Sequence, residues 1–426
     1  MSPPHSPHSP RDPIGLTALL ALAFAGLCSI RLTIPSAPYF DEVHYLPAAR
    51  ALLDQSGWLN REHPLLGKEI MAAGIALFGD NPLGWRIFSV VAGATALFAF
   101  CRALWFASYS RFASLAYGVM LASGFALFVH SRIAMLDIFM ACFFAIALWQ
   151  LAAAMREPET GRRRLAIAGI ALGLAMASKW NAAALAVIPG AGFLVLRAFA
   201  GRRRLLMSRR GMPLPGMTLL EAGLWLGALP LAVYWLTFLP AYFFAEGALQ
   251  PGGFVALHRE IIALQSSVIQ PHPYQSNWPD WLLNLRAIWY LYEAADGAQR
   301  GILLIGNPLT MLLGLPAMAW CLWAGIARKR WDALAVFVFF AASVLFWAAV
   351  NKPVQFYYHY FLPSCFLLAG LALALNALWQ RGRRRVAGGI LAGSVAIFAW
   401  FYPILSAAPL AGPQSFNHWM WLDSWR

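Results

Sequence analysis

PYFDEVHYLPAARALLDQSGWLNREHPLLGK, residues 38–68, separates the first long apolar run of this chain from the second. The segment contains two adjacent carboxylates, Asp41 and Glu42, followed by a second polar group that includes His63 and Lys68. Ionisable side chains gathered between hydrophobic runs, on a connection this long, are typical of a functional site. We therefore expect the chemistry of the protein to lie in this segment.

The composition of the chain is that of a polytopic membrane protein. Of the 426 residues, 60% are hydrophobic and only 12% are charged, far from the balance of a soluble domain. The net charge of +14 does not indicate nucleic-acid binding, because the basic residues form short clusters between apolar runs. The five cysteines lie inside apolar runs without a CxxC pair, so we interpret them as core residues.

About 20 apolar residues cross a bilayer as a helix, and eleven runs of the sequence approach that length. We expect spans at 14–33, 85–105, 112–129, 133–154, 164–178, 180–199, 217–239, 301–326, 332–350, 357–379 and 386–404. These predict an all-α membrane domain over residues 14–426. The polar, proline-rich residues 1–13 are expected to be a disordered cytoplasmic tail.

Arginine clusters alternate with polar loops along the chain. They lie at 156–164, 197–210, 328–330 and 381–385, and the positive-inside rule makes them cytoplasmic, which places the N terminus inside and the C terminus outside. Two long outer loops follow, 34–84 and 240–300. In them we expect surface helices at 43–57, 68–79 and 253–268. The aromatic residues of 272–293 are interpreted mainly as an interfacial belt.

Further charged residues map to the outer ends of the predicted spans. Arg86 begins the second span, Arg132 and Asp137 flank the turn into the fourth, and Lys179 follows the fifth. Charges at this depth are costly unless they are paired or line a wet cavity; Arg132 and Lys179 are both candidate partners for Asp137. A cationic pocket beside a carboxylate suits a phosphate-linked lipid donor and a hydroxyl acceptor.

His359, in FYYHYF, leaves two interpretations open: a structural histidine in an aromatic belt or a contact to the donor phosphate. No ligand spacing makes His63, Glu62 and Asp41 a metal site. We assign no metal-binding residues, and leave a divalent cation, Mg²⁺ or Mn²⁺, open as a cofactor.

The segments FDEVHY, HPLLGK, GWRIFSVVAG, SRIAMLD, ASKWNA, LLIGNP, FYYHYFLP and WMWLDSW resemble, in sequence and order, the protein O-mannosyltransferases. The resemblance runs from about residue 14 to the end. It implies an inverting glycosyltransferase of the GT-C class. Such an enzyme moves a sugar, most often mannose, from a polyprenyl phosphate to Ser or Thr hydroxyls of exported proteins, here expected at the periplasmic face of a bacterial inner membrane.

The resemblance implies that Asp41 is the general base, that Glu42 helps to bind a substrate, and that Arg86 contacts the donor phosphate or holds the acidic loop. We add to the donor-phosphate and substrate-binding set a group of outer-end residues: His63, Lys68, Arg132, Asp137, Lys179 and His359. An inverting displacement needs one carboxylate to take the acceptor proton, while cations stabilise the leaving phosphate. The opposed carboxyl pair of glycosidases is not required.

Two departures from the family pattern limit this expectation. Leu65 follows Pro64 where the family commonly has a second proline, and residues 240–300 are too few for the β-trefoil insert of eukaryotic members. The nearest alternative is a GT-C enzyme that modifies a lipid or glycan, such as lipid A. A transporter would more often show inverted repeats or broken helix pairs, and the sequence has neither.

Overall fold

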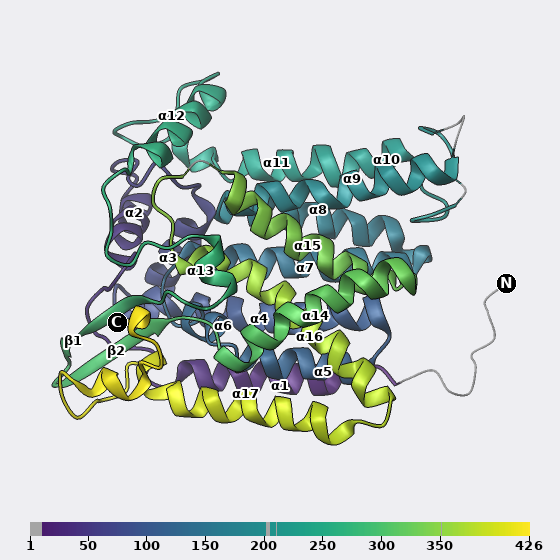
Figure 1. Ribbon diagram of the computed structural model, residues 1–426. Helices are drawn as coiled ribbons and strands as arrows, with labels where there is room; N and C mark the ends of the chain where they lie inside the picture. Colours follow the sequence, from purple (N-terminus) through teal and green to yellow (C-terminus); the bar gives the residue numbers. More distant parts are fainter. Residues whose placement is uncertain (1–10, 202–204, 210, 351) are drawn as a thin grey trace.

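The structure is a computed structural model that describes residues 11–201, 205–209, 211–350 and 352–426, so the predicted tail lies mostly outside the described residues. Its long helices run side by side as one bundle (Figure 1). Eight helical segments of the described chain are long and apolar enough to cross a membrane. They are α4 (Pro82–Ser108), α7 (Leu136–Arg156), α9 (Asn181–Gly201), α10 to α11 (Leu219–Leu236), α14 (Pro308–Ala327), α15 (Trp331–Ala349), α16 with the turn before it (Tyr357–Gln380) and α17 (Arg384–Leu405).

The other three predicted spans also form helices of the bundle, but shorter or more polar ones. They are α1 (Ile14–Ser29), α5 (Arg111–Ala122) and α8 (Gly161–Ser178). The first two have 16 and 12 residues, and α8 has three arginines near its start. Each packs on longer helices, α1 and α5 on α4, and α8 on α7. A helix therefore stands at every predicted position, and eight of them meet the criteria for a span.

Two predicted spans have wrong boundaries. The run 301–326 begins in a β-strand, and its helix starts only at Pro308, after Asn307 in an extended conformation. Proline suits the first turn of a helix because its missing N–H would have no partner there. The run 112–129 is divided between α5 and α6 (Ala126–His130) at Phe125, whose φ of +63° interrupts the helical backbone.

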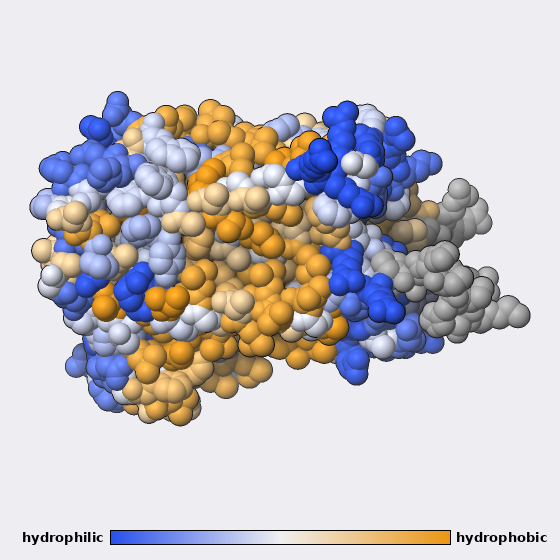
Figure 2. All heavy atoms as spheres, turned by 90° about the horizontal axis from the view of Figure 1, so that it is seen from below, coloured by the Kyte–Doolittle hydropathy of each residue, from blue (hydrophilic) through white to orange (hydrophobic). Residues whose placement is uncertain are grey.

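The outer loops are built from short elements that gather at one end of the bundle, opposite the arginine-rich loops (Figure 1). They comprise α2 (Glu42–Asp54), α3 (Leu66–Phe78), α12 (Phe254–Ser267) and α13 (Trp278–Leu282). The three predicted surface helices are confirmed as α2, α3 and α12. Figure 2 shows an apolar belt between two hydrophilic ends. The protein is thus a multi-pass integral membrane protein.

A β-hairpin stands at the outer end where the sequence analysis expected only helix and aromatic belt. Strand β1 (Ile288–Ala295) pairs antiparallel with β2 (Ala298–Leu304), and the turn residues Asp296 and Gly297 both have positive φ. An Asp-Gly pair between strand-forming residues is a strong hairpin signal. The prediction of an all-helical chain missed it. Tyr290 on β1 is 4% exposed, so it belongs to the protein interior and not to a belt.

The first outer segment is fixed to the bundle by close packing of α3 on α4. A Cβ atom at Gly74 of α3 would lie 2.2 Å from the carbonyl oxygen of Gly84 in α4, so this approach requires glycine. The side chain of Asn81 accepts hydrogen bonds from the first free N–H groups of α4, those of Leu83 and Gly84, which caps the helix. Helix α3 is therefore held closely against α4.

Candidate active site

A buried ion pair between Glu42 and Arg86 anchors the acidic segment. Both side chains are inaccessible to solvent, and the Arg86 guanidinium donates from Nε and Nη2 to the two carboxylate oxygens, each at 2.8 Å. The backbone N–H of Ala134 also donates to Glu42, at 2.9 Å. Such a pair needs every polar atom satisfied, because burial of charge is otherwise costly. Glu42 is thus engaged in holding the fold together.

Arg86 uses its remaining donors on the loop before α2. Nη1 donates to the carbonyl oxygens of Leu32 and Pro35, and Nη2 to that of Ala37. With the two bonds to Glu42, all five N–H groups of the guanidinium are occupied. Of its two predicted roles, this geometry supports holding the acidic loop.

Arg132 binds the backbone carbonyl groups at the C-terminal end of α1. It donates to the carbonyl oxygens of Cys28, Ile30 and Arg31 and, at 3.3 Å, to that of Ser406. The last carbonyls of a helix lack partners within it, and a cation at this end is favourable. Arg132 therefore joins α1 to the chain after α17, and its guanidinium is directed at the backbone.

Lys68 is fully buried beneath the loop between α2 and α3. Its Nζ donates to the carbonyl oxygens of Asn60 at 2.6 Å and His63 at 3.0 Å. Burial lowers the pKa of Lys68 to about 7. Through these two hydrogen bonds Lys68 stabilises the conformation of the loop that contains His63.

Asp41 lies at the start of α2 and is half-buried. Its carboxylate accepts a hydrogen bond from Tyr45 Oη at 3.3 Å. Burial raises the pKa of Asp41; the charge of Lys179 opposes this rise and that of Asp137 adds to it. The residue before it, Phe40, has a φ of +50° and stacks on Tyr290 with ring centroids 3.9 Å apart. The β-hairpin thus contacts Phe40, the residue that precedes Asp41.

Asp137, in the first turn of α7, forms a buried ion pair with Lys179 at the end of α8. Lys179 Nζ lies 2.9 and 2.7 Å from the two carboxylate oxygens, and 4.9 Å from the centre of the Tyr358 ring. Of the two candidate partners for Asp137, the structure therefore selects Lys179. An ammonium group has three N–H donors, and among the residues that the structure describes Lys179 uses two of them on Asp137.

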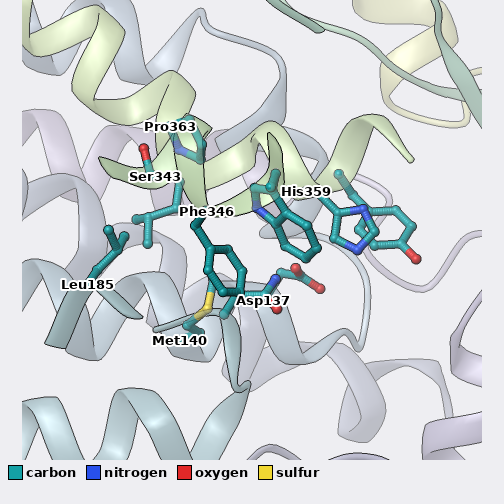
Figure 3. Close-up of a pocket in the computed structure, with 11 residues that line it drawn as sticks. Asp137, Met140, Leu185, Ser343, Phe346, His359 and Pro363 are labelled. Atoms are coloured by element: carbon teal, nitrogen blue, oxygen red, sulfur yellow. The ribbon is translucent and has the colours of Figure 1, made fainter. Parts of the chain in front are cut away.

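A pocket opens beside this pair, between α7, α9, α15 and α16 (Figure 3). Asp137, Ser343 and His359 are among its polar lining residues. Met140, Leu185 and Phe346 supply apolar walls. The pocket thus places one carboxylate, which is paired with Lys179, beside apolar side chains in a small space of about 10 Å³.

The two predicted histidines occupy different surroundings. His63 is half-buried with its ring edge-on to Tyr45, and burial together with Lys179 and Lys68 lowers its pKa well below the usual value. His359 is buried, and the centroid of its ring lies 4.0 Å from that of Trp347. Its Nδ1 lies 3.0 Å from both the backbone nitrogen and the carbonyl oxygen of Phe356. His359 is therefore both part of an aromatic cluster and part of the pocket lining.

Lys352 belongs to this region although the sequence analysis did not include it among the site residues. It is half-buried, and its Nζ donates to Gln265 Oε1 of α12 at 2.9 Å. Burial, followed by the charge of Lys179, lowers the pKa of Lys352 to about 8. One signal was available: the chain has only four lysines among 32 basic residues, and three of them lie at this end.

Within the described residues there is no group of three or more His, Cys, Asp or Glu side chains that could hold a metal ion. Glu62, one of the residues considered for such a site, instead accepts a hydrogen bond from Asn60 Nδ2 at 2.7 Å.

Two family models match nearly the whole chain. Residues 39–243 match dolichyl-phosphate-mannose-protein mannosyltransferase, and residues 251–425 match the C-terminal four-transmembrane region of protein O-mannosyltransferase. Polyprenol-phosphate-mannose–protein mannosyltransferase of Mycobacterium tuberculosis is 29% identical over 97% of this chain and 91% of its own length. The Corynebacterium glutamicum protein of the same name is 26% identical over 96% and 91%.

Solved structures show the same fold at low sequence identity. The Saccharomyces cerevisiae protein O-mannosyltransferase Pmt1–Pmt2 complex bound to the sugar donor is 14% identical, with a TM-score of 0.81 over 96% of this chain and 93% of that chain. ArnT from Cupriavidus metallidurans bound to undecaprenyl phosphate is 16% identical, with a TM-score of 0.56 over 85% and 60%. The GT-C fold is confirmed, and the chain belongs to the protein O-mannosyltransferase family.

Proposed function

We propose that this protein transfers mannose from a polyprenyl-phosphate donor to Ser or Thr hydroxyls of exported proteins, with inversion at the anomeric carbon. The names and the extent of the bacterial relatives support the donor and the protein acceptor. The observation that best supports this chemistry is that, within the described residues, the carboxylate of Asp41 is not engaged in an ion pair. Glu42 and Asp137 are locked in ion pairs, whereas Asp41 has no ion-pair partner within the described part of the chain.

Asp41 has the properties of a general base in this reaction. As the acceptor hydroxyl oxygen attacks the anomeric carbon, Asp41 takes the hydroxyl proton, and the bond between that carbon and the phosphate oxygen breaks. The electron pair leaves with the polyprenyl phosphate. A base works best when its pKa is shifted toward the working pH, and the raised pKa of Asp41 is in that direction.

The leaving phosphate needs positive charge at a fixed position. We assign this role to Lys179, whose ammonium group is held by Asp137, a residue of the pocket lining. His359 lines the pocket, and His63 lies near enough to Lys179 for the lysine charge to lower its pKa. Side-chain cations supply this stabilisation in our scheme; transfer measured in EDTA, and again with Mg²⁺ or Mn²⁺ added, tests whether a divalent cation increases it.

We further propose that the site faces the periplasm of a bacterial inner membrane. The support is the charge distribution: the arginine-containing loops after α7, α14 and α16 lie at the end of the bundle opposite α2 (Figure 1), and such loops stay in the cytoplasm. A donor and an acceptor at the periplasmic face would reach the site directly.

The deciding experiment uses purified protein, polyprenyl-phosphate-mannose and a peptide rich in Ser and Thr, with mass spectrometry of the peptide. The wild-type protein should add one hexose, and Asp41→Asn, which retains the shape but not the base, should not. Hexose transfer to a lipid acceptor in place of the peptide would contradict the protein-directed function. Near-normal transfer by Asp41→Asn would remove Asp41 from its role.

A further inference from the structure

The cations of the outer end differ in how much of their hydrogen-bonding capacity the fold uses. Arg86 donates five hydrogen bonds to carbonyl and carboxylate oxygens. Arg132 and Lys68 are directed at backbone carbonyls. Lys179 has one N–H left beside Asp137. These four residues therefore provide little free capacity for a phosphate that carries several acceptor oxygens.

Lys352 is the exception. It lies between α15 and α16, and among the residues that the structure describes its Nζ has one hydrogen-bond partner, the side-chain amide oxygen of Gln265. An ammonium group has three N–H donors, so two remain. The amide oxygen of Gln265 carries no net charge, whereas a phosphate oxygen would add Coulomb attraction between opposite charges to the hydrogen bond with Lys352.

Gln265 itself connects three parts of the outer end. It comes from α12 in the second outer loop, and its Nε2 donates to the backbone carbonyl of Glu62 in the first outer loop at 2.9 Å and lies 3.4 Å from His63 Nδ1. Its Oε1 accepts from Lys352. One amide group thus links both outer loops and the segment that leads to His359. Lys352 is held beside the site by a partner that an anion can replace.

We propose that Lys352 binds the phosphate of the lipid donor together with Lys179, and that the phosphate displaces the amide oxygen of Gln265 from Lys352. This inference rests on the proposed function. In the free protein the Gln265–Lys352 hydrogen bond, which we call the latch, keeps the ammonium group in place. When the donor binds, the phosphate oxygens take over the N–H groups of Lys352, while Gln265 keeps its bond to the carbonyl of Glu62.

Two substitutions of Gln265, one that adds a negative charge and one that does not, distinguish this proposal from a purely structural role of the hydrogen bond. Gln265→Glu would convert the latch into an ion pair and place a negative charge next to the phosphate, so donor binding should weaken. Gln265→Ala would release Lys352 and leave its charge available. If the hydrogen bond served only to hold α12, the alanine variant would be the more damaging of the two.

The test measures KM for polyprenyl-phosphate-mannose and kcat at saturating donor. Lys352→Ala and Gln265→Glu should each raise the donor KM about ten- to a hundredfold, as expected for the loss of a hydrogen bond to a charged group, with a smaller change in kcat. Lys352→Arg should recover most of the loss, and Gln265→Ala should leave KM within about threefold. Lys329→Ala, at the exposed opposite end, is the matched control and should change neither constant.

Binding of polyprenyl phosphate without a sugar separates this inference from the proposed function. Wild-type protein should bind polyprenyl phosphate more tightly than the corresponding polyprenol, and Lys352→Ala should lose that preference. This holds even if the transferred sugar is not mannose. An unchanged donor KM and unchanged phosphate preference in folded Lys352→Ala would overturn the proposal, as would a Gln265→Ala variant that is impaired as strongly as Gln265→Glu.

Discussion

At the scale of single residues, the choice between lysine and arginine reflects different tasks. Arg86 and Arg132 present planar guanidinium groups to several carbonyl oxygens at once. Lys179 and Lys352 present compact ammonium groups with donors to spare. Arginine suits fixed multidentate contacts, and lysine changes partners and pKa more readily. Lys68, the third of the chain's four lysines to lie near the site, differs from these two because it donates to backbone carbonyls of a loop.

Removal of Arg86 should destabilise the protein before it affects catalysis. Arg86→Ala leaves the Glu42 carboxylate buried without its partner, and such losses cost about 3–5 kcal/mol of unfolding free energy. Thermal unfolding followed by tryptophan fluorescence measures this loss. Arg50→Ala removes an exposed pair with Asp80 and should cost at most about 1 kcal/mol. Normal stability with a raised donor KM in Arg86→Ala would instead support a direct phosphate contact.

The acid side of the pH profile should report Asp41. A base must be unprotonated to act, so kcat/KM falls as the pH drops through the raised pKa of Asp41. The hydrogen bond from Tyr45 favours the charged carboxylate. Tyr45→Phe should therefore raise this pKa and move the acid limb to higher pH by roughly half to one pH unit. An acid limb that stays in place would show that another group controls it.

Sequence reasoning placed several of the predicted site residues at the same end of the bundle but did not predict their individual contacts. Asp41, Asp137 and Lys179 do lie close enough for their charges to interact. Arg132 contacts the end of α1 across 102 residues of sequence. Lys68 contacts carbonyl groups only eight and five residues before it, but the fold of that loop decides which groups reach its ammonium group. Periodicity and charge position carry no information about such contacts. Lys352 was missed because its partner, Gln265, is 87 residues away.

At the scale of elements, the β-hairpin contributes to the position of the proposed base. Tyr290 of β1 stacks on Phe40, directly before Asp41, and Asp296 at the hairpin turn accepts hydrogen bonds from the backbone and side chain of Ser36. The hairpin thus contacts both ends of the segment that leads into α2. The long apolar runs predicted the bundle helices, but the hairpin lies within aromatic sequence that membrane interfaces also favour, so hydropathy alone could not separate the two.

Loss of the aromatic stack should reduce turnover. An aromatic pair contributes about 0.5–1.5 kcal/mol, so Tyr290→Leu should lower kcat by about two- to tenfold with little change in the donor KM. Tyr290→Phe keeps the ring but loses the hydroxyl contact to His130, and should retain most of the activity. Steady-state kinetics on both variants measures the difference. Equal losses in the two variants would assign the effect to the hydroxyl.

At the scale of the whole molecule, the two ends of the bundle can be assigned to the two sides of the membrane. All five native cysteines are buried, so thiol reagents should react little with the unmodified protein. Glu293→Cys on β1 and Lys329→Cys between α14 and α15 place exposed thiols at opposite ends. In intact cells an impermeant maleimide should label the first and not the second. The reverse result would invert the topology.

Helices α9 and α15 border the pocket of Figure 3. In the most apolar stretch of each helix, only 28% of the residues are buried within the protein. A donor that reaches the pocket past these helices arrives by diffusion within the lipid, so the quantity that governs its encounter with the enzyme is its mole fraction in the bilayer. Diluting the donor with inert lipid at constant total donor should then slow transfer, whereas diluting the proteoliposomes with buffer should leave the rate per enzyme unchanged at saturating peptide. The donor KM of such an enzyme is a surface concentration.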